Sequence, residues 1–364
     1  MIFTYGCARL THPSLFASVL IIRSHLSPIG MNDMDIRVRN AGSCMNPISL
    51  DEIEQARERI AESTLRSPLV HLGIDDAPTD TDIYLKLENL QPTGSFKVRG
   101  AGNVIALLSD KERDQGVYTC SAGNMGQALA WHARRNRVPC TVIVPDTAPE
   151  TKLAAIKRFG AKIIQMPWNE LWQVAVTHRY APLEASVFIH PFVDRRMIAG
   201  NGTIGLEILE DLPNVDSVII PFGGGGLATG IATAVKGRKK DTRVYACEPE
   251  TAAPLAASFT AGSAQAVKRI SSFVDGIGAE SVLPEMWELV QPLLEKSIVV
   301  SLREIASAIG LLFERNRVIA EGAGAASVAA ALSGKAGTGR VVCVVSGGNI
   351  DLSKLVRILH GEIP

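Results

Sequence analysis

The sequence predicts an α/β protein with two open, twisted, mostly parallel sheets flanked by helices. Two observations support this prediction. From residue 48 onward, short apolar strand patterns alternate with helical patterns, which is typical of parallel βαβ units with right-handed crossovers. Apolar residues make up 46% of the 364 residues and aromatic residues only 5%, a composition that suits helices packed on buried parallel strands.

The first predicted element is a helix over residues 50–64. Ser49 is the expected N-cap, and Glu52 completes a capping box with it. Further strands are expected at 83–89, 116–122, 139–145, 161–167, 186–192, 217–223, 242–249 and 340–349. Further helices are expected at 95–109, 124–136, 151–160, 168–180, 200–212, 227–238, 301–316 and 322–334.

The order of these elements predicts two domains and an N-terminal extension. Residues 116–193 hold a small set of βαβ units of their own, and residues 47–115 and 194–364 form a larger domain around them. Residues 1–46 show little periodicity and contain several alternative start methionines. We therefore expect this segment to be a poorly ordered extension or to precede the true start of the protein.

Charge and composition exclude several classes of protein. Lys plus Arg and Asp plus Glu both number 37, so the basic surplus of a general nucleic-acid binder is missing. The six cysteines form no Cys-x-x-Cys pair, and the histidines are scattered, which argues against a zinc site. No apolar run is long enough to span a bilayer. The sequence predicts a cytoplasmic protein that binds neither nucleic acids nor membranes.

Ligands of parallel α/β proteins bind where strands end and helices begin, and one such junction here carries a lysine. Lys97 follows the segment Pro92-Thr93-Gly94-Ser95-Phe96 and falls in the first turn of a predicted helix. A cation at this position opposes the helix dipole, which favours the deprotonated amine needed to form an imine. From its position alone, a surface lysine beside Arg99 is the favoured interpretation.

Two further junctions are turns that suit an anion. Ser121-Ala122-Gly123-Asn124 opens a helix directly after a strand, and its backbone N–H groups can hold a carboxylate or phosphate. Gly223-Gly224-Gly225-Gly226 lies between another strand and its helix. Taken alone, the first is better explained as an ordinary N-cap turn. The second also fits a dinucleotide fingerprint, because Ala228 follows and Glu248 ends the next strand.

The last predicted strand ends in Ser346-Gly347-Gly348-Asn349, which places a hydroxyl at the edge of the sheet. Together, the four junctions supply one lysine, two turns for anions and one hydroxyl. This set fits a phosphorylated aromatic aldehyde better than a nicotinamide.

Five motifs occur in the order seen in one family: LKLENLQPTGSFKVRGA, SAGNMGQALA, PFGGGGLATG, EGAGAASVAA and VVSGGNID. Over residues 48–354 the sequence resembles fold-type II (tryptophan synthase β-like) enzymes that depend on pyridoxal 5'-phosphate (PLP). Within them it resembles the serine/threonine dehydratase (threonine ammonia-lyase) family, which is related to serine racemase. The joint match favours PLP over a dinucleotide as the cofactor.

The resemblance implies a role for each motif. Lys97 is expected to carry the cofactor as an imine and to act in catalysis. The other expected cofactor-binding residues are Phe96, Asn124, Gly223, Gly224, Gly225, Gly226, Glu321 and Ser346. The expected substrate-binding residues are Ser121, Ala122, Gly123 and Met125. The larger domain then binds PLP, and residues 116–193 lie on the substrate side.

Departures from the family pattern reduce the number of activities that we expect. Ala122 stands where a racemase carries a serine, which leaves Lys97 as the only expected base. Met125 replaces a common histidine and puts the identity of the substrate in doubt. Glu248 matches a cation-ligand position of some relatives, but Pro254 replaces the second acid. We therefore expect no metal, with Glu248 the only candidate, and an exposed residue at a strand end explains Glu248 equally well.

The predicted reaction is α,β-elimination of water from a 3-hydroxy amino acid such as L-threonine or L-serine, giving a 2-oxo acid and ammonia. A racemase, a β-replacement synthase or a non-catalytic protein that binds PLP or amino acids stays as the alternative. The resemblance also implies a homo-oligomer, a dimer or tetramer. The chain ends soon after Leu352, so we expect no regulatory domain that responds to isoleucine.

Overall fold

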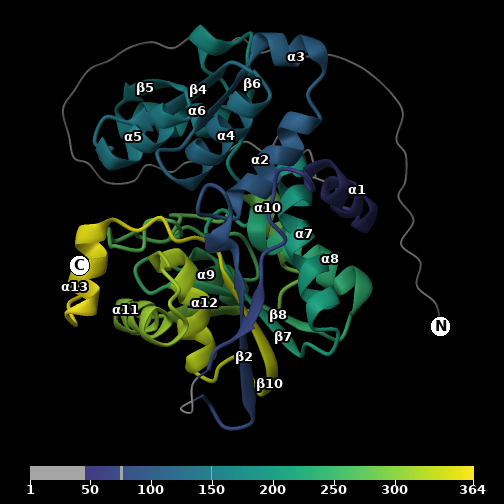
Figure 1. Ribbon diagram of the computed structural model, residues 1–364, viewed down its shortest axis with the longest axis vertical. Coiled ribbons are helices and arrows are strands. Elements are labelled where there is room, and N and C mark those ends of the chain that lie inside the picture. Colours follow the sequence, from purple (N-terminus) through teal and green to yellow (C-terminus); the bar gives the residue numbers. More distant parts are fainter. Residues whose placement is uncertain (1–45, 74–76, 149) are drawn as a thin grey trace, which may run out of the picture. The chain divides into compact units, whose positions relative to one another are not determined.

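The computed structural model describes residues 46–73, 77–148 and 150–364 (Figure 1). The expected N-terminal extension lies outside these residues, except for residue 46. Within the described residues the chain forms two sheets, mostly parallel and flanked by helices. The predicted fold class is therefore confirmed.

The larger sheet has six strands in the order β1-β2-β10-β7-β8-β9. All neighbouring pairs are parallel except β1 and β2, which pair antiparallel at the edge. These strands are β1 Leu69–His71, β2 Thr81–Leu87, β7 Ser217–Pro221, β8 Arg243–Pro249, β9 Ser297–Val300 and β10 Gly339–Val345. The last strand of the chain thus lies between β2 and β7, at the middle of the sheet.

The smaller sheet has four strands in the order β5-β4-β3-β6, and all of its neighbouring pairs are parallel. These strands are β3 Val117–Cys120, β4 Cys140–Pro145, β5 Lys162–Met166 and β6 Val187–Phe188. They all come from the segment that the sequence predicts as a separate set of βαβ units.

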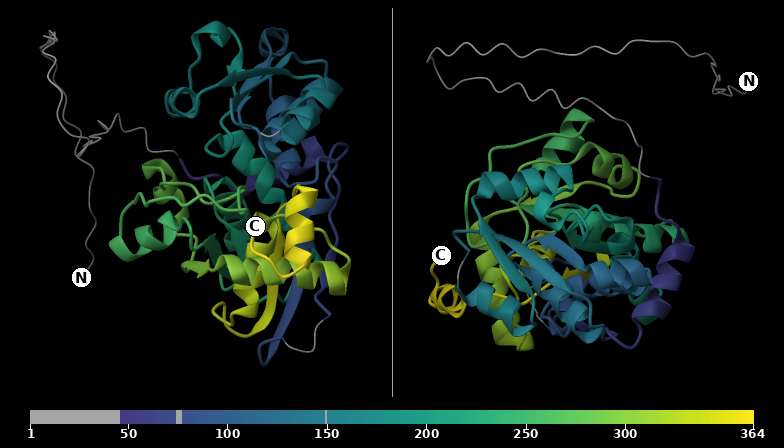
Figure 2. Two further views of the ribbon diagram at one scale, coloured as in Figure 1. Left: turned by 90° about the vertical axis from the view of Figure 1, so that its left-hand side faces the viewer. Right: turned by 90° about the horizontal axis from the view of Figure 1, so that it is seen from above.

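Helices connect the strands. They are α1 Leu50–Ile60, α2 Lys97–Ala106, α3 Asp110–Gln115, α4 Asn124–Arg135, α5 Glu150–Arg158, α6 Trp168–Thr177, α7 Arg195–Asp211, α8 Gly226–Arg238, α9 Pro254–Ala261, α10 Pro284–Val290, α11 Leu302–Leu311, α12 Gly322–Leu332 and α13 Leu352–Leu359. A π-helical turn, Leu312–Asn316, continues α11. Figures 1 and 2 both show α13 lying against α11. Among the residues that the structure describes, no helix is long and apolar enough to cross a membrane.

The larger sheet is buried on both faces, as parallel sheets are. Alternate residues of β10 show this: Val341, Cys343 and Val345 belong to one apolar cluster with α11 and α12. Val342 and Val344 belong to a second cluster, with α7 and α8. Because successive side chains of a strand point to opposite faces, helices cover both sides of the sheet.

Most predicted elements are present, and the missed ones are short. Ser49 and Glu52 form the predicted capping box at the start of α1. The predicted helix over residues 168–180 ends at Thr177, because His178 adopts a left-handed backbone conformation (φ 58°). The prediction lacks β1, α3, α9, α10, β9 and α13. Each has ten residues or fewer, which is too few to show a clear hydrophobic period of a helix or strand in the sequence.

Candidate active site

Lys97 is the first residue of α2, at the N-terminal end of the helix. Its side chain is partly buried, and its Nζ donates a hydrogen bond to the carbonyl oxygen of Pro191 at 2.5 Å. Nζ also lies 5.1 Å from the centroid of the Phe96 ring. Desolvation lowers the pKa of the Lys97 amine to about 8, although the nearby Glu321 carboxylate acts in the opposite direction. A larger share of this amine is therefore neutral at physiological pH than in an exposed lysine.

Backbone hydrogen bonds tie the segment before Lys97 to the end of β10. The amide of Phe96 donates to the carbonyl oxygen of Ser346 at 3.0 Å, and the amide of Gly348 donates to Gly94 at 2.9 Å. Ser346 is buried. Lys97 and Ser346 are far apart in the sequence, but these backbone hydrogen bonds hold the segments that carry them side by side.

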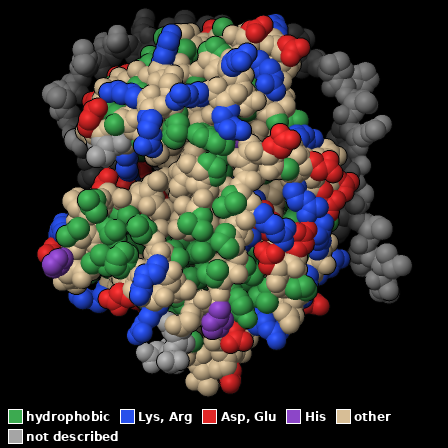
Figure 3. Space-filling model, in the orientation of Figure 1, with side chains coloured by type: hydrophobic (Ala, Val, Ile, Leu, Met, Phe, Trp, Pro, Cys, Tyr) green, Lys and Arg blue, Asp and Glu red, His purple; other side chains and the backbone are tan. Residues whose placement is uncertain are grey.

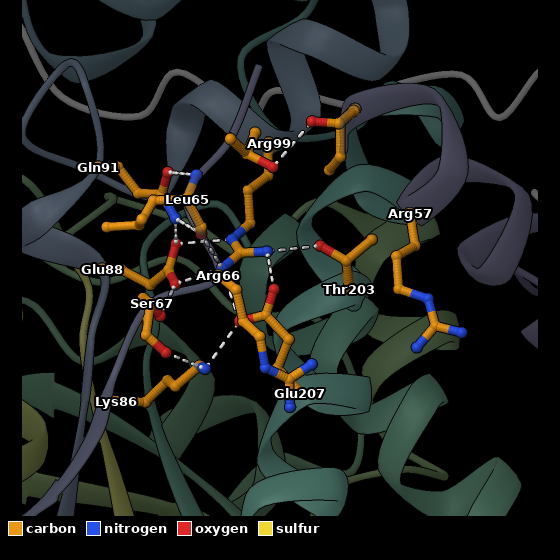
Figure 4. Close-up of polar contacts among 12 residues, drawn as sticks. Arg57, Leu65, Arg66, Ser67, Lys86, Glu88, Gln91, Arg99, Thr203 and Glu207 are labelled. Atoms are coloured by element: carbon orange, nitrogen blue, oxygen red, sulfur yellow. Dashed lines mark hydrogen bonds and ion pairs between the residues drawn. The ribbon is translucent and has the colours of Figure 1, made fainter. Parts of the chain in front are cut away.

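A buried network of charged side chains supports the same helix from below (Figure 4). The guanidinium of Arg99 makes bidentate hydrogen bonds to both Glu88 and Glu207, at 2.6 to 2.9 Å. Lys86 on β2 completes the network, with its Nζ 2.7 Å from Glu207. All four side chains are nearly inaccessible to solvent. Two positive and two negative charges balance, so the network holds α2 against β2 and α7 without a net buried charge.

We did not predict this network from the sequence. The sequence nevertheless contains a sign of buried charges. Lys86 interrupts a run of apolar strand residues, and Glu88 directly follows that run. A charged residue in such a run needs a buried partner of opposite charge.

The tetraglycine turn follows β7 and opens α8. Gly225 has φ +90°, a left-handed conformation that suits glycine. A Cβ atom on Gly224 would lie 2.1 Å from the ring of Phe192, and one on Gly226 would lie 2.3 Å from the Phe192 carbonyl oxygen. The backbone N–H groups in the first turn of α8 have no partner within the helix. The turn therefore presents amide donors at a helix N-terminus, which suits a phosphate group.

Asn124, the first residue of α4, lies in a chain of amide and carboxylate side chains. Its Nδ2 donates to Glu321 at 2.8 Å, and its Oδ1 accepts from Asn349 at 2.8 Å. Glu321 is buried, and desolvation together with the charge of Asp275 raises the pKa of its carboxyl group to about 7. The structure thus brings together Asn124 and Glu321, two of the predicted cofactor-binding residues.

The predicted substrate loop lies directly before α4. The amide of Gly123 donates to the Ser121 hydroxyl at 3.2 Å, and Ser121 and Ala122 are partly buried. Met125 is only 1% exposed, and it packs in an apolar cluster with Val98 and other residues of α2 and α4. This placement differs from our expectation that Met125 faces the substrate, because its side chain fills the contact between two helices.

A pocket of about 230 Å³ lies beside these groups. Its lining residues come from segments that follow or connect the strands of both sheets. They include Gly123, Asn124, Lys152, Asp275, Glu321 and Asn349. The Nζ of Lys152 on α5 lies 2.7 Å from a carboxylate oxygen of Asp275 at the edge of the pocket. Figure 3 shows a hollow on the left of its view, with Lys and Arg side chains above it. The pocket gives a small polar molecule access to Asn124 and Glu321.

Glu248 serves a structural purpose. Its carboxylate accepts hydrogen bonds from the amides of Leu255 and Ala256, at the start of α9, and from the Ser297 hydroxyl. It is 1% exposed, so the interpretation as an exposed residue at a strand end is wrong. In the part of the chain that the structure describes, no group of three or more His, Cys, Asp or Glu side chains is arranged to hold a metal ion.

The residues present fit PLP. The amine of Lys97 suits an aldehyde, and the tetraglycine turn suits a phosphate. The backbone of Ser346, a residue with a neutral hydroxyl, is hydrogen-bonded to the segment before Lys97. The hydroxyl oxygen of Ser95 is also buried next to Lys97, and no described residue forms a hydrogen bond with it. A buried donor without a partner is unusual in native proteins and is consistent with a bound polar group.

Comparisons with known proteins agree with this chemistry. The family profile described as "Pyridoxal-phosphate dependent enzyme" matches residues 60–347. The L-threonine ammonia-lyase of Thermotoga maritima is 40% identical over 316 residues, which cover 86% of this chain and 78% of that protein. The catabolic L-threonine dehydratase TdcB of Escherichia coli K12 is 37% identical over 316 residues, covering 86% of this chain and 96% of that protein.

A solved structure with a similar fold points to the same family. Maize serine racemase superposes with a TM-score of 0.76 at 32% sequence identity, over 86% of this chain and 97% of the racemase. The matched region includes Lys97 and the tetraglycine turn, and the matches cover most of the chain. The chain belongs to the family of pyridoxal-phosphate-dependent enzymes, and its cofactor is pyridoxal 5'-phosphate.

Proposed function

We propose that the protein is an ammonia-lyase that removes water from a 3-hydroxy amino acid such as L-threonine or L-serine. The substrate loses its Cα proton and its β-hydroxyl group, and the resulting enamine hydrolyses to a 2-oxo acid and ammonia. The names of the threonine ammonia-lyase and dehydratase relatives support this reaction. The single observation that carries it is the position of the Lys97 amine at the N-terminal end of α2, where it donates to the Pro191 carbonyl oxygen and desolvation lowers its pKa to about 8.

In this proposal, Lys97 both holds the cofactor and moves the proton. PLP, when bound, supplies an electron sink for the charge that develops at the substrate Cα. With PLP bound, the Lys97 amine would take the Cα proton of the substrate. Asn124 would orient the cofactor ring through its side-chain amide, and Ser346 would supply a neutral hydroxyl to the ring nitrogen. Phe96 would pack beside the ring, and Glu321 fixes Asn124.

Two turns bind the anionic groups. The backbone amides of Gly223, Gly224, Gly225 and Gly226 hold the cofactor phosphate. Ser121, Ala122 and Gly123 hold the substrate carboxylate at the N-terminal end of α4. We further propose that residues 116–193 act as the substrate-side domain and the rest of the described chain as the cofactor domain. The pocket lined by Gly123 and Asn124 supports this division, because it lies where the two meet.

A racemase is the second candidate, and the likeness to maize serine racemase favours it. Racemisation needs a proton donor or acceptor on each face of the substrate Cα. Ala122 carries no such group, so we propose that only Lys97 exchanges the proton. A β-replacement synthase or a non-catalytic binding protein fits less well, because the lysine, the amide and the hydroxyl are all in place.

The location and assembly of the protein are also proposals. Cys120, Cys140, Cys247 and Cys343 are free thiols, which supports a reducing, cytoplasmic location. A dimer or tetramer is expected, and light scattering on the purified protein measures it.

One experiment tests the reaction. The purified protein, supplied with PLP, is incubated separately with L-threonine and L-serine while 2-oxo acid and ammonia are measured, and the remaining amino acid is resolved into its enantiomers. We expect equal amounts of 2-oxo acid and ammonia and no D-amino acid. Accumulation of the D-enantiomer without 2-oxo acid would establish the racemase instead.

A further inference from the structure

The buried histidine His190 hydrogen-bonds to neither the lysine amine nor the tetraglycine turn, but it belongs to a turn that contacts both. His190 follows β6 and is 5% exposed. Its Nδ1 accepts hydrogen bonds from the backbone amides of Phe192 and Val193, at 3.3 and 3.1 Å. One ring nitrogen therefore satisfies two amides of the tight turn formed by residues 190–193.

This turn contacts the two parts of the proposed PLP site. The carbonyl oxygen of Pro191 receives the hydrogen bond from Lys97. On the other side, the Phe192 ring and carbonyl oxygen lie where Cβ atoms on Gly224 and Gly226 would be, within 2.1 and 2.3 Å of them. A change in the turn therefore moves the partner of the amine and the cover of the glycine turn together.

The surroundings of His190 fix its protonation and its orientation. Burial lowers the pKa of the imidazole to about 3, and the charges of His178 and Lys97 act in the same direction. The ring is therefore neutral at physiological pH, and Nδ1 keeps the lone pair that an acceptor needs. The rings of Phe188, His178 and Phe192 pack around it, with centroids 5.9, 4.9 and 4.4 Å away. These contacts keep Nδ1 directed at the turn.

We propose that His190 is a positioning residue, whose Nδ1 holds the turn that sets Lys97 and the tetraglycine turn at their working separation. The inference rests on the proposed function, because it assigns His190 a role in the PLP site. It predicts that loss of one acceptor atom weakens cofactor binding and slows elimination, although His190 contacts neither the substrate nor the cofactor phosphate turn itself.

Three substitutions of His190 separate its acceptor from its bulk. His190→Leu keeps much of the volume and removes the acceptor. In His190→Asn, Oδ1 takes the place of Nδ1 and can accept from the amides two and three residues on, as asparagine does in turns. His190→Gln also carries an amide oxygen but places it one bond further out, so it serves as the matched control.

The readouts are the dissociation constant for PLP, from titration of the visible absorbance band of the bound cofactor, and kcat for 2-oxo acid formation. Thermal unfolding identifies the folded variants. We expect His190→Leu and His190→Gln to bind PLP at least about tenfold more weakly, with a lower kcat, because two buried amides lose their acceptor. We expect His190→Asn to restore both quantities to within about threefold of the unchanged protein.

The outcomes are distinct. Equal impairment of His190→Asn and His190→Gln would overturn the inference, since bulk and not the acceptor would then matter. Unchanged PLP affinity and kcat in folded His190→Leu would overturn it as well. If His190→Leu does not fold, the comparison of the Asn and Gln variants still decides. A lack of 2-oxo acid formation by the unchanged protein would instead contradict the proposed function, whereas the PLP titrations of the variants would still test His190.

Discussion

The Nζ of Lys97 donates a hydrogen bond to the carbonyl oxygen of Pro191, at 2.5 Å. The two residues belong to different parts of the fold, since Lys97 opens α2 and Pro191 follows the last strand of the smaller sheet. Pro191 continues into Phe192, which covers the tetraglycine turn. The backbone of residues 191–192 therefore joins the amine to the tetraglycine turn.

The first prediction concerns the lysine itself. Lys97→Ala removes both the proposed covalent attachment for the cofactor and the proposed base. We expect the visible absorbance band of the bound cofactor to disappear and kcat for elimination to fall by about 100-fold to 10,000-fold, as expected for loss of a positioned base. Lys111→Ala, which changes an exposed lysine on α3, is the matched control and should change neither. Substantial elimination by Lys97→Ala would refute the role of this residue.

The second prediction uses the lowered pKa of the same amine. An unprotonated amine is needed to react with the PLP aldehyde, and burial lowers the Lys97 pKa from 10.5 to about 8. The protonated fraction therefore falls as pH rises through about 8. We expect the rate at which cofactor-free protein regains its visible band, after PLP is added, to increase with pH and to level off above this value.

Glu321→Gln is the control for this pH profile. The Glu321 charge raises the pKa of Lys97, in opposition to the desolvation. Its removal should therefore move the midpoint of the profile to lower pH. A midpoint near that of an exposed lysine, at about pH 10.4, would mean that burial does not lower the pKa.

The alternation of strands and helices was sufficient to predict mostly parallel sheets, because a helix between two strands returns the chain to the end at which the first strand began, and the next strand then runs parallel to it. The order of the strands was not predictable in this way. The sequence places β10 last, yet it pairs with β2 and β7 at the centre of the sheet. Such pairing depends on contacts between distant segments, which local periodicity does not report.

The site residues too were predictable where the signal is local in the sequence and were missed where it depends on distant contacts. Lys97 and the tetraglycine turn were found because each is an unusual residue pattern at a junction between a strand and a helix. The burial of Glu248 was missed, because it depends on α9, a short helix that the sequence analysis did not predict. Lys86 was missed because its partner Glu207 lies on α7, far along the chain. The roles of the site residues themselves stay predictions until variants are measured.

The third prediction concerns the tetraglycine turn. Gly225 has φ +90°, and a Cβ atom there would lie 2.5 Å from Met286. We expect Gly225→Ala to strain the turn, to redirect the amides in the first turn of α8 and to weaken PLP binding by at least about tenfold. Gly237→Ala lies in the same helix, where a Cβ atom would meet only Leu50 at 3.6 Å. It should leave the PLP dissociation constant unchanged, and similar weakening in both variants would contradict the prediction.

The fourth prediction compares two arginines in different surroundings. Arg99 is buried and bonds to Glu88 and Glu207, so Arg99→Leu leaves two buried carboxylates without their shared cation. Removing one partner of a buried ion pair costs about 3–5 kcal/mol of stability. Arg66 pairs with Glu210 and Asp211, but its side chain is 52% exposed. Pairs of this kind contribute about 1 kcal/mol or less.

Urea unfolding of both variants measures this difference. We expect a much larger loss for Arg99→Leu than for Arg66→Leu, and Arg99→Lys serves if the leucine variant does not fold. Because Arg99 lies two residues after Lys97 on α2, its loss should also lower kcat, whereas Arg66→Leu should not. Equal free energies of unfolding for the two leucine variants would show that the buried network does not hold α2 in place. An unchanged kcat in folded Arg99→Lys would show that Lys97 keeps its position without the bidentate contacts.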